Sequence, residues 1–225
     1  MPHDDAQPRP NHPEPSGRHE TGPLRVPGSA HRNSWQRAGG GPVVVGAILL
    51  AVATWIEYVV LGPGAPLEVF VLFLVLFGAS IVLFAVAAFA LAHYGIVGTS
   101  PGGRFALRAY GLCWVISQAA YLAYKYVLPP ATSNFYAVLL STLFLALTFV
   151  FGVVAAAFIA ARRIAWGPAR WSLFVAIAIS VGVGLLTSRS DSLILLTVWE
   201  TISALGQVFV GLTYWFARGR DPWIS

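Results

Sequence analysis

Six long apolar runs separated by short connections dominate this sequence. They cover residues of about 43–61, 69–92, 105–128, 135–161, 171–187 and 193–216. At 1.5 Å per residue, helices of these lengths approach or exceed the roughly 30 Å hydrocarbon core of a bilayer. Only 10% of the residues are charged, against about a quarter in soluble domains. The sequence therefore predicts an all-α, polytopic integral membrane protein whose six transmembrane helices form an antiparallel bundle.

The chain divides into a polar tail, a membrane domain and a short end. Residues 1–41 contain seven prolines and few large apolar side chains, which predicts a disordered cytoplasmic tail. Residues 42–218 form the predicted six-helix membrane domain, and residues 219–225 a short cytoplasmic C-terminal tail. The tail histidines are too widely spaced, and too far from any cysteine, for a zinc site: His3, His12, His19 and His31. We expect no metal and no cofactor.

Basic residues alternate between the two sides of the predicted bundle. The ten nearest the spans on the side of the tail are Arg25, Arg32, Arg37, Arg104, Arg108, Arg162, Arg163, Arg170, Arg218 and Arg220. Only Lys125 and Arg189 lie on the other side. Because positive charge accumulates on the cytoplasmic side, this asymmetry predicts a multi-pass protein of the cell membrane with both termini in the cytoplasm.

The arginines also bear on partners. They cluster beside hydrophobic segments, which favours membrane orientation over a nucleic-acid partner. Arg25, Arg32 and Arg37 can in addition contact anionic lipid, at about 1 kcal/mol each near the surface.

The last apolar run carries a carboxylate, Glu200, well inside the predicted span. Keeping this group either charged or protonated in the bilayer costs about 3 to 4 kcal/mol. Helical spacing places further polar or small residues on the same face: Thr197, Ser203, Gln207, Gly211 and Tyr214. Since lipid offers this stripe no partner, we expect it to face the interior of the bundle.

The third run supplies candidate partners on one helical face: Trp114, Gln118, Tyr121 and Lys125. Depth counted from the outer helix ends places Lys125 near Glu57, which predicts an ion pair at the outer rim. The same count places Tyr121 level with Glu200, and we expect Glu200 to contact Tyr121 or Gln118.

Two interpretations of these polar residues remain open. In the first, Glu200, Gln207, Ser203, Gln118 and Tyr121 line an outward-opening pocket in which Glu200 binds a cation, a proton or a substrate amine. In the second, they are interhelical hydrogen bonds that fix the rotation of the helices.

Small residues recur every fourth position in the fourth and fifth runs. The two rows are Thr148, Gly152, Ala156 and Ala160, and Ser172, Ala176, Ser180, Gly184 and Ser188. Because membrane helices associate through small residues, these rows predict that the two spans pack together.

No catalytic motif occurs in the sequence, so an enzyme is not indicated. We favour a non-enzymatic accessory, sensor-like or interaction subunit that acts with a protein partner. The alternative is a small transporter, coupled to protons through Glu200 and assembled as a homo-oligomer. A membrane-embedded lipid enzyme is a third hypothesis, for which the sequence offers no catalytic set.

Overall fold

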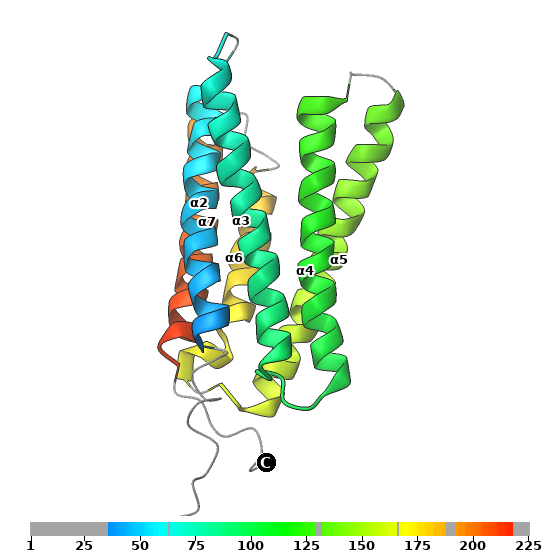
Figure 1. Cartoon of the computed structure of the whole chain (residues 1–225), viewed down its shortest axis with the longest axis vertical. Helices are drawn as coiled ribbons and strands as arrows, with labels where there is room; N and C mark the ends of the chain where they lie inside the picture. Colours follow the sequence, from blue (N-terminus) through cyan, green and yellow to red (C-terminus); the bar gives the residue numbers. More distant parts are fainter. Residues whose placement is uncertain (1–35, 63, 129–131, 166, 188–191, 218–225) are drawn as a thin grey trace, which may run out of the picture.

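The computed structural model describes residues 36–217, with gaps at 63, 129–131, 166 and 188–191. The described part is helical and contains no strand. Its six long helices are α2 (Gly41–Trp55), α3 (Leu67–His93), α4 (Pro101–Leu122), α5 (Thr132–Arg162), α6 (Ser172–Thr187) and α7 (Leu193–Trp215) (Figure 1). They coincide with the six predicted runs, which confirms the all-α class.

Three five-residue π-helical turns extend these helices: η1 (Gln36–Gly40) precedes α2, η2 (Ile56–Val60) follows α2, and η3 (Ala123–Val127) follows α4. A one-turn 3-10 helix, η4 (Gly167–Arg170), precedes α6. Ser100 caps the start of α4, where its hydroxyl accepts a hydrogen bond from the Gly103 amide at 3.3 Å, and Pro101 takes the first helical position.

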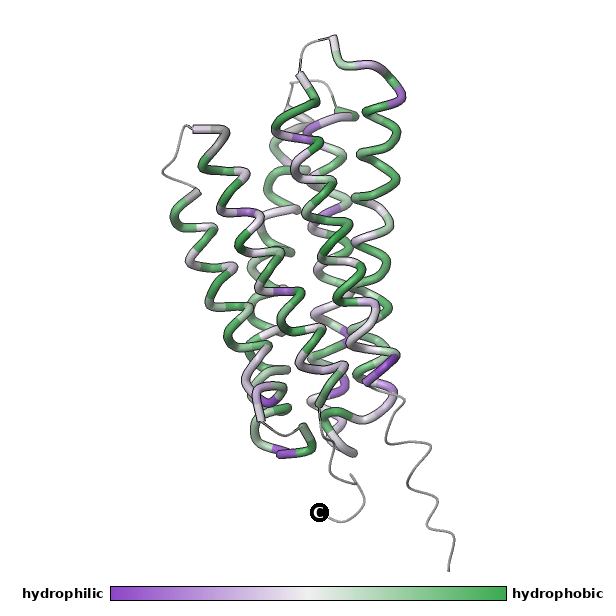
Figure 2. Tube along the Cα trace, turned by 90° about the vertical axis from the view of Figure 1, so that its left-hand side faces the viewer, coloured by the Kyte–Doolittle hydropathy of each residue, from purple (hydrophilic) through white to green (hydrophobic). Residues whose placement is uncertain are grey.

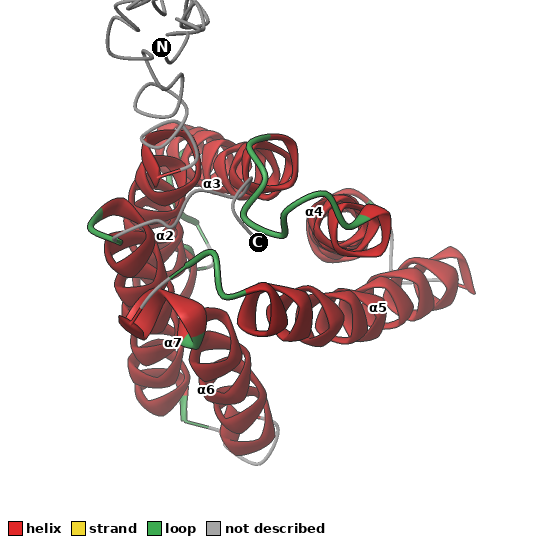
Figure 3. Cartoon of the chain, turned by 90° about the horizontal axis from the view of Figure 1, so that it is seen from below, coloured by secondary structure: helices red, strands yellow, loops and turns green. Residues whose placement is uncertain are grey.

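The helices form an open ring in the order α5, α4, α3, α2, α7, α6, in which each helix packs against the next. Figure 3 shows this arrangement along the bundle axis. The two ends of the ring, α5 and α6, contact each other much less than the other neighbours do. We call the boundary between α5 and α6 the seam.

The two ends of the bundle differ in charge. The α3–α4 and α5–α6 connections and the described chain ends lie at one end, which we call the lower end, and the other connections lie at the upper end (Figure 1). The lower end carries all the described arginines: Arg37, Arg104, Arg108, Arg162, Arg163 and Arg170. The upper end carries Lys125.

The predicted tail is wrong at its boundary, because residues 36–41 are already helical. The stretch has few large apolar side chains, yet Gly39, Gly40 and Gly41 serve close packing. A Cβ atom at Gly40 would lie 2.7 Å from the backbone nitrogen of Trp215. A Cβ atom at Gly211 would lie 2.8 Å from the backbone nitrogen of Val44. Only glycine permits this backbone approach between the first and last helices. Residues 1–35 and 218–225 lie outside the described residues.

The burial of small and large apolar residues is reversed relative to a soluble protein. Small residues such as Ala47, Ala53, Ala92 and Ala155 are buried, whereas large apolar side chains such as Leu72, Val75 and Val82 are exposed. Figure 2 shows apolar residues along most of each helix and hydrophilic ones mainly near the two ends.

Four helical segments are long and apolar enough to cross a membrane: Gln36–Val60, Leu67–His93, Phe135–Arg162 and Leu195–Trp215. Among the described helices, α6 is apolar but shorter. The chain therefore has the character of a membrane protein.

The predicted packing of the fourth and fifth spans is wrong over most of their length. Gly152 of α5 does face Ile177 of α6, with an added Cβ 3.1 Å from the Ile177 Cδ1 atom. Higher on α6, a Cβ at Gly184 would meet nothing within 4 Å, and Ser180 pairs with Ser203 of α7 instead. Ser180 and Gly184 of α6 thus face α7 and an open space rather than α5. Ser188 lies outside the described residues.

Candidate functional site

A cavity of about 640 Å³ occupies the centre of the ring and is lined by all six long helices. Its lower boundary consists of buried side chains, among them Leu91, Leu107, Ala176 and Val210. In the upper half its walls include exposed residues of the seam, Val138 of α5 with Val181 and Leu185 of α6. The cavity is therefore closed below and open towards the upper part of the seam.

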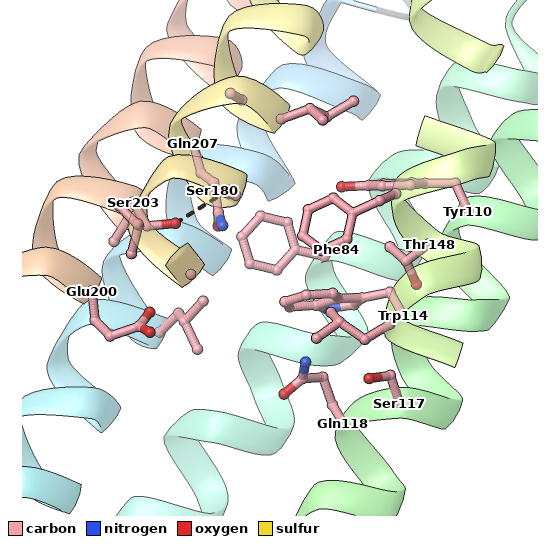
Figure 4. A pocket seen from close by; sticks show the side chains of 18 of the residues that line it. Phe84, Tyr110, Trp114, Ser117, Gln118, Thr148, Ser180, Glu200, Ser203 and Gln207 are labelled. Atoms are coloured by element: carbon pink, nitrogen blue, oxygen red, sulfur yellow. Dashed lines mark hydrogen bonds between the residues drawn. The ribbon is translucent and has the colours of Figure 1, made fainter. Parts of the chain in front are cut away.

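One wall of the cavity is the polar stripe of α7. Glu200, Ser203 and Gln207 project from successive turns of this helix towards the cavity (Figure 4). The Ser203 hydroxyl lies 3.2 Å from that of Ser180, which joins α7 to α6. The Glu200 carboxyl is partly buried and forms no hydrogen bond or ion pair with another residue in the described part of the chain.

The opposite wall is aromatic and polar. Trp114 and Gln118 of α4 and Phe84 of α3 face the α7 stripe across the cavity (Figure 4). The Trp114 and Phe84 rings pack edge to face with centroids 6.0 Å apart. Behind them, Ser117 and Ser141 each donate a hydrogen bond to the backbone carbonyl of the other, at 3.0 and 3.1 Å, and fasten α4 to α5.

Two buried polar atoms in these walls have no hydrogen-bond partner in the described structure: the Trp114 Nε1 donor and the Gln207 Oε1 acceptor. Each such group costs about 1 to 3 kcal/mol when it is left unsatisfied. Both belong to residues that line the cavity, so a bound molecule or water can satisfy them.

The upper rim of the cavity carries a cluster around Glu57. Its side chain is only 6% exposed and forms an ion pair with Lys125. Tyr121 and Tyr126 also donate hydrogen bonds to Glu57 Oε1, the latter at 2.7 Å. We call Glu57, Tyr121, Lys125 and Tyr126 the rim cluster.

The rim cluster surrounds an ammonium group with aromatic rings. The Lys125 Nζ atom lies 5.4, 5.1 and 5.5 Å from the ring centroids of Tyr58, Tyr121 and Tyr126. These distances allow cation–π attraction, which adds to the ion pair. Phe73 supports the cluster from α3, with its ring 5.4 Å from that of Tyr126. This carboxylate is thus already occupied by a cation of the chain itself.

The residues of the rim cluster lie on π-helical turns or next to them. Glu57 belongs to η2 and Lys125 and Tyr126 to η3. These turns end in bonds to the carbonyl five residues earlier, Leu61 to Ile56 and Leu128 to Ala123, both 2.8 Å long. A π-turn inserts extra backbone into a helix and is often found at functional sites.

The predicted site residues all lie at the cavity or its rim. Glu200, Gln207, Ser203, Gln118 and Tyr121 line the cavity, and Glu57 pairs with Lys125. The expected hydrogen bond between Glu200 and Tyr121 or Gln118 is absent from the described structure, and Tyr121 bonds to Glu57 instead. The prediction failed because it compared only the depths of residues along the helix axes. It ignored the length of the tyrosine side chain and the offset between neighbouring helices. Gly211 leaves the predicted stripe and contacts α2.

Several residues of the site were not predicted. Tyr126 completes the rim cluster, and Ser180, Phe84, Tyr110 and Thr148 add to the cavity walls. Tyr121 and Tyr126 lie within four residues of Lys125 in the sequence, and this proximity was a signal for an aromatic cage around its ammonium group. Phe84 carries no such signal, because one phenylalanine in an apolar span resembles any other.

No three His, Cys, Asp or Glu side chains of the described ranges come together as a metal-binding group. Comparison with known proteins finds no matching family model, curated protein or solved structure.

Proposed function

We propose that the chain is a six-span integral membrane protein, with both termini in the cytoplasm, that binds a small ligand containing a basic nitrogen in its central cavity. This role is non-enzymatic and sensor-like. The apolar exposed surface and the four helices long enough to cross a bilayer support the membrane location. The arginines at the lower end support the orientation, because positive charge favours the cytoplasmic side.

The observation that carries the proposal is the carboxyl of Glu200, which has no hydrogen bond or ion pair with another described residue and lies on the wall of a cavity of about 640 Å³. Small-molecule pockets range from about 300 to 1,000 Å³ and combine apolar walls with a few placed polar groups. The described lining residues include two carboxylates and no Lys, Arg or His. Since Glu57 already holds Lys125, Glu200 is the group that remains for an incoming cation.

Binding tests this function directly. Purified protein in detergent is titrated with primary amines of varied size and with the matched alcohols and carboxylates, and heat stability is recorded. We expect saturable stabilisation by amines alone, and its loss in Glu200→Gln, which keeps the shape of the side chain but not its charge. Equal stabilisation of wild type and Glu200→Gln would contradict the proposal, as would a panel in which no amine binds.

Cysteine labelling tests the six spans and the orientation. Cys113 is the single cysteine and is buried, so Cys113→Ala provides a clean background. In intact cells, an impermeant thiol reagent should label Gly62→Cys at the upper end. It should reach Thr99→Cys at the lower end only after the membrane is permeabilised. Labelling of both positions in intact cells, or of neither, would contradict the orientation.

The transporter remains a second candidate because the cavity is open on one side only. Buried side chains close its lower end while its upper part reaches exposed residues, as in an outward-facing state. Glu200 would then carry a proton in exchange for the cation. Proteoliposomes with a pH gradient distinguish the two candidates: amine uptake driven by the gradient and lost in Glu200→Gln supports transport, and binding without uptake supports a sensor.

A further inference from the structure

The walls of the cavity and the seam together specify a class of ligand. We propose that the ligand is a single-chain amphiphile with a cationic amine head, and that it enters the cavity from the bilayer between α5 and α6. This inference rests on the function proposed above and names the ligand class for the same site.

The head group is assigned by the α7 stripe. Among the described residues, the Glu200 carboxyl has no cationic partner and Gln207 Oε1 has no donor, so a ligand that donates hydrogen bonds suits both groups. An ammonium group donates up to three hydrogen bonds and carries the complementary charge. The rim cluster shows that this protein already holds one primary ammonium, that of Lys125, with a carboxylate and tyrosine rings. Trp114 and Phe84 offer comparable ring faces across the cavity from Glu200 (Figure 4).

The apolar chain is assigned by the rest of the lining. Away from the α7 stripe, the side chains of α3, α5 and α6 that line the cavity are mainly aliphatic or aromatic. The hydroxyls of Thr142 and Thr148 on α5 donate hydrogen bonds to carbonyls of their own helix. A ligand that is polar throughout would place polar groups against these apolar walls. An alkyl chain would instead bury its apolar surface against them, which is favourable. One end of the ligand is therefore charged and the remainder apolar.

The route of entry is assigned by the seam. Near the lower end α5 and α6 touch, as at Gly152 and Ile177, and higher up they diverge (Figures 1 and 3). The residues of the seam that line the cavity are apolar and exposed: Val138 is 41%, Val181 41% and Leu185 65% exposed. In a membrane these side chains face the hydrocarbon region. The cavity is consequently continuous with the bilayer at this seam, and an amphiphile dissolved there can reach Glu200 without crossing the rim.

Two glycines of α6 make the route testable. An added Cβ meets nothing within 4 Å at either Gly182 or Gly184, so a larger side chain is sterically accepted at both. Gly184 lines the cavity and Gly182 does not. Gly184→Phe should therefore obstruct the seam, and Gly182→Phe is its matched control on the same helix.

The experiment uses the full chain in lipid nanodiscs and a long-chain primary amine brominated at the end of its chain. Bromine quenches tryptophan fluorescence on contact, and Trp114 lies in the cavity wall. The contribution of Trp114 is obtained as the difference between the wild type and Trp114→Phe. We expect saturable quenching of Trp114, weakened about ten- to a hundredfold in Glu200→Gln, since a charge-assisted hydrogen bond is replaced by a neutral one. Gly184→Phe should slow the onset of quenching, and Gly182→Phe should leave it unchanged.

Comparisons on the wild-type protein keep the inference falsifiable even if a variant does not fold. Equal quenching by the matched brominated alcohol would overturn the assignment of the head group. Equally tight binding of a short-chain amine would overturn the amphiphile while leaving the proposed amine binding intact. Binding of no amine at all would remove both proposals. Equal onset rates for Gly184→Phe and Gly182→Phe would overturn entry through the seam.

Discussion

Two glutamates lie at the same cavity in opposite circumstances. Glu57, at the rim, holds the ammonium of Lys125 and accepts hydrogen bonds from two tyrosines. Glu200, on the α7 wall, forms no side-chain hydrogen bond or ion pair in the described structure. Removing one member of a buried ion pair destabilises a fold, because the remaining charge is left uncompensated. A carboxylate left without such a partner is available to a ligand.

The rim cluster and the α7 wall also differ in the contacts that join their helices. The rim cluster connects α2 to α4 across the top of the ring. The α7 wall is held from the side, through the contact of Ser203 with Ser180 and the hydrogen bond from Trp55 to Thr201 at 3.0 Å. Rim residues thus tie the two sides of the ring together, while Glu200 is positioned by neighbours and faces the cavity.

The largest effect is expected when the rim carboxylate is removed. Glu57→Ala leaves Lys125 and two tyrosine hydroxyls without their acceptor. We expect a loss of about 2 to 3 kcal/mol of unfolding free energy, below the 3 to 5 kcal/mol of a fully buried pair because Lys125 remains partly exposed. Denaturant unfolding in detergent measures it. Glu68→Ala is the control, since Glu68 is exposed in the first turn of α3 and should change little. Equal losses for the two variants would contradict a structural role for the rim.

A smaller effect is expected from one tyrosine of the rim. Tyr126→Phe removes the 2.7 Å hydrogen bond to Glu57 but keeps the aromatic ring beside Lys125. We expect a loss of about 1 kcal/mol, because two other donors still serve the carboxylate. Tyr124→Phe is the control in the same unfolding assay, because the Tyr124 hydroxyl forms no hydrogen bond in the described part of the chain. A larger loss of stability in Tyr124→Phe than in Tyr126→Phe would contradict the assignment of Tyr126 to the rim cluster.

The smallest effect on stability is expected at Glu200. Glu200→Gln breaks no hydrogen bond of the described structure, so the loss of unfolding free energy should be less than about 0.5 kcal/mol. The variant should nevertheless lose amine binding. A loss of stability as large as that of Glu57→Ala would show that Glu200 is a structural group, and the contrast between the two glutamates would disappear.

The positions of the helices were predictable from the sequence, since long apolar runs separated by Pro- and Gly-containing connections leave few alternatives. The start of the first helix was not. Glycine occurs both in flexible tails and at close helix crossings. Only the backbone of Gly211 beside Gly40 shows that Gly40 serves a crossing. Similarly, the small residues of α6 could face α5, α7 or an open space, and their spacing is the same in each case.

The composition of the site was predictable where the residues are ionisable, and less so elsewhere. Glu57, Lys125 and Glu200 stand out because charge is rare in an apolar span. The pairing of Tyr121 and Tyr126 with Glu57 depends on the turn η3, which is wider than an α-helical turn. In a regular α-helix, positions 121 and 126 would point in different directions. No periodicity of the sequence indicated that local change.

The most direct test of the contrast is labelling with a hydrophobic carbodiimide, which partitions into bilayers and reacts with protonated, accessible carboxyl groups. Applied to the full chain in lipid nanodiscs, with the modified residue identified by mass spectrometry, it should label Glu200 and spare Glu57. Prior addition of a long-chain primary amine should protect Glu200. Labelling of Glu57 in preference to Glu200, or labelling of Glu200 that the amine does not affect, would contradict the assignment of Glu200 as the open binding group of the cavity.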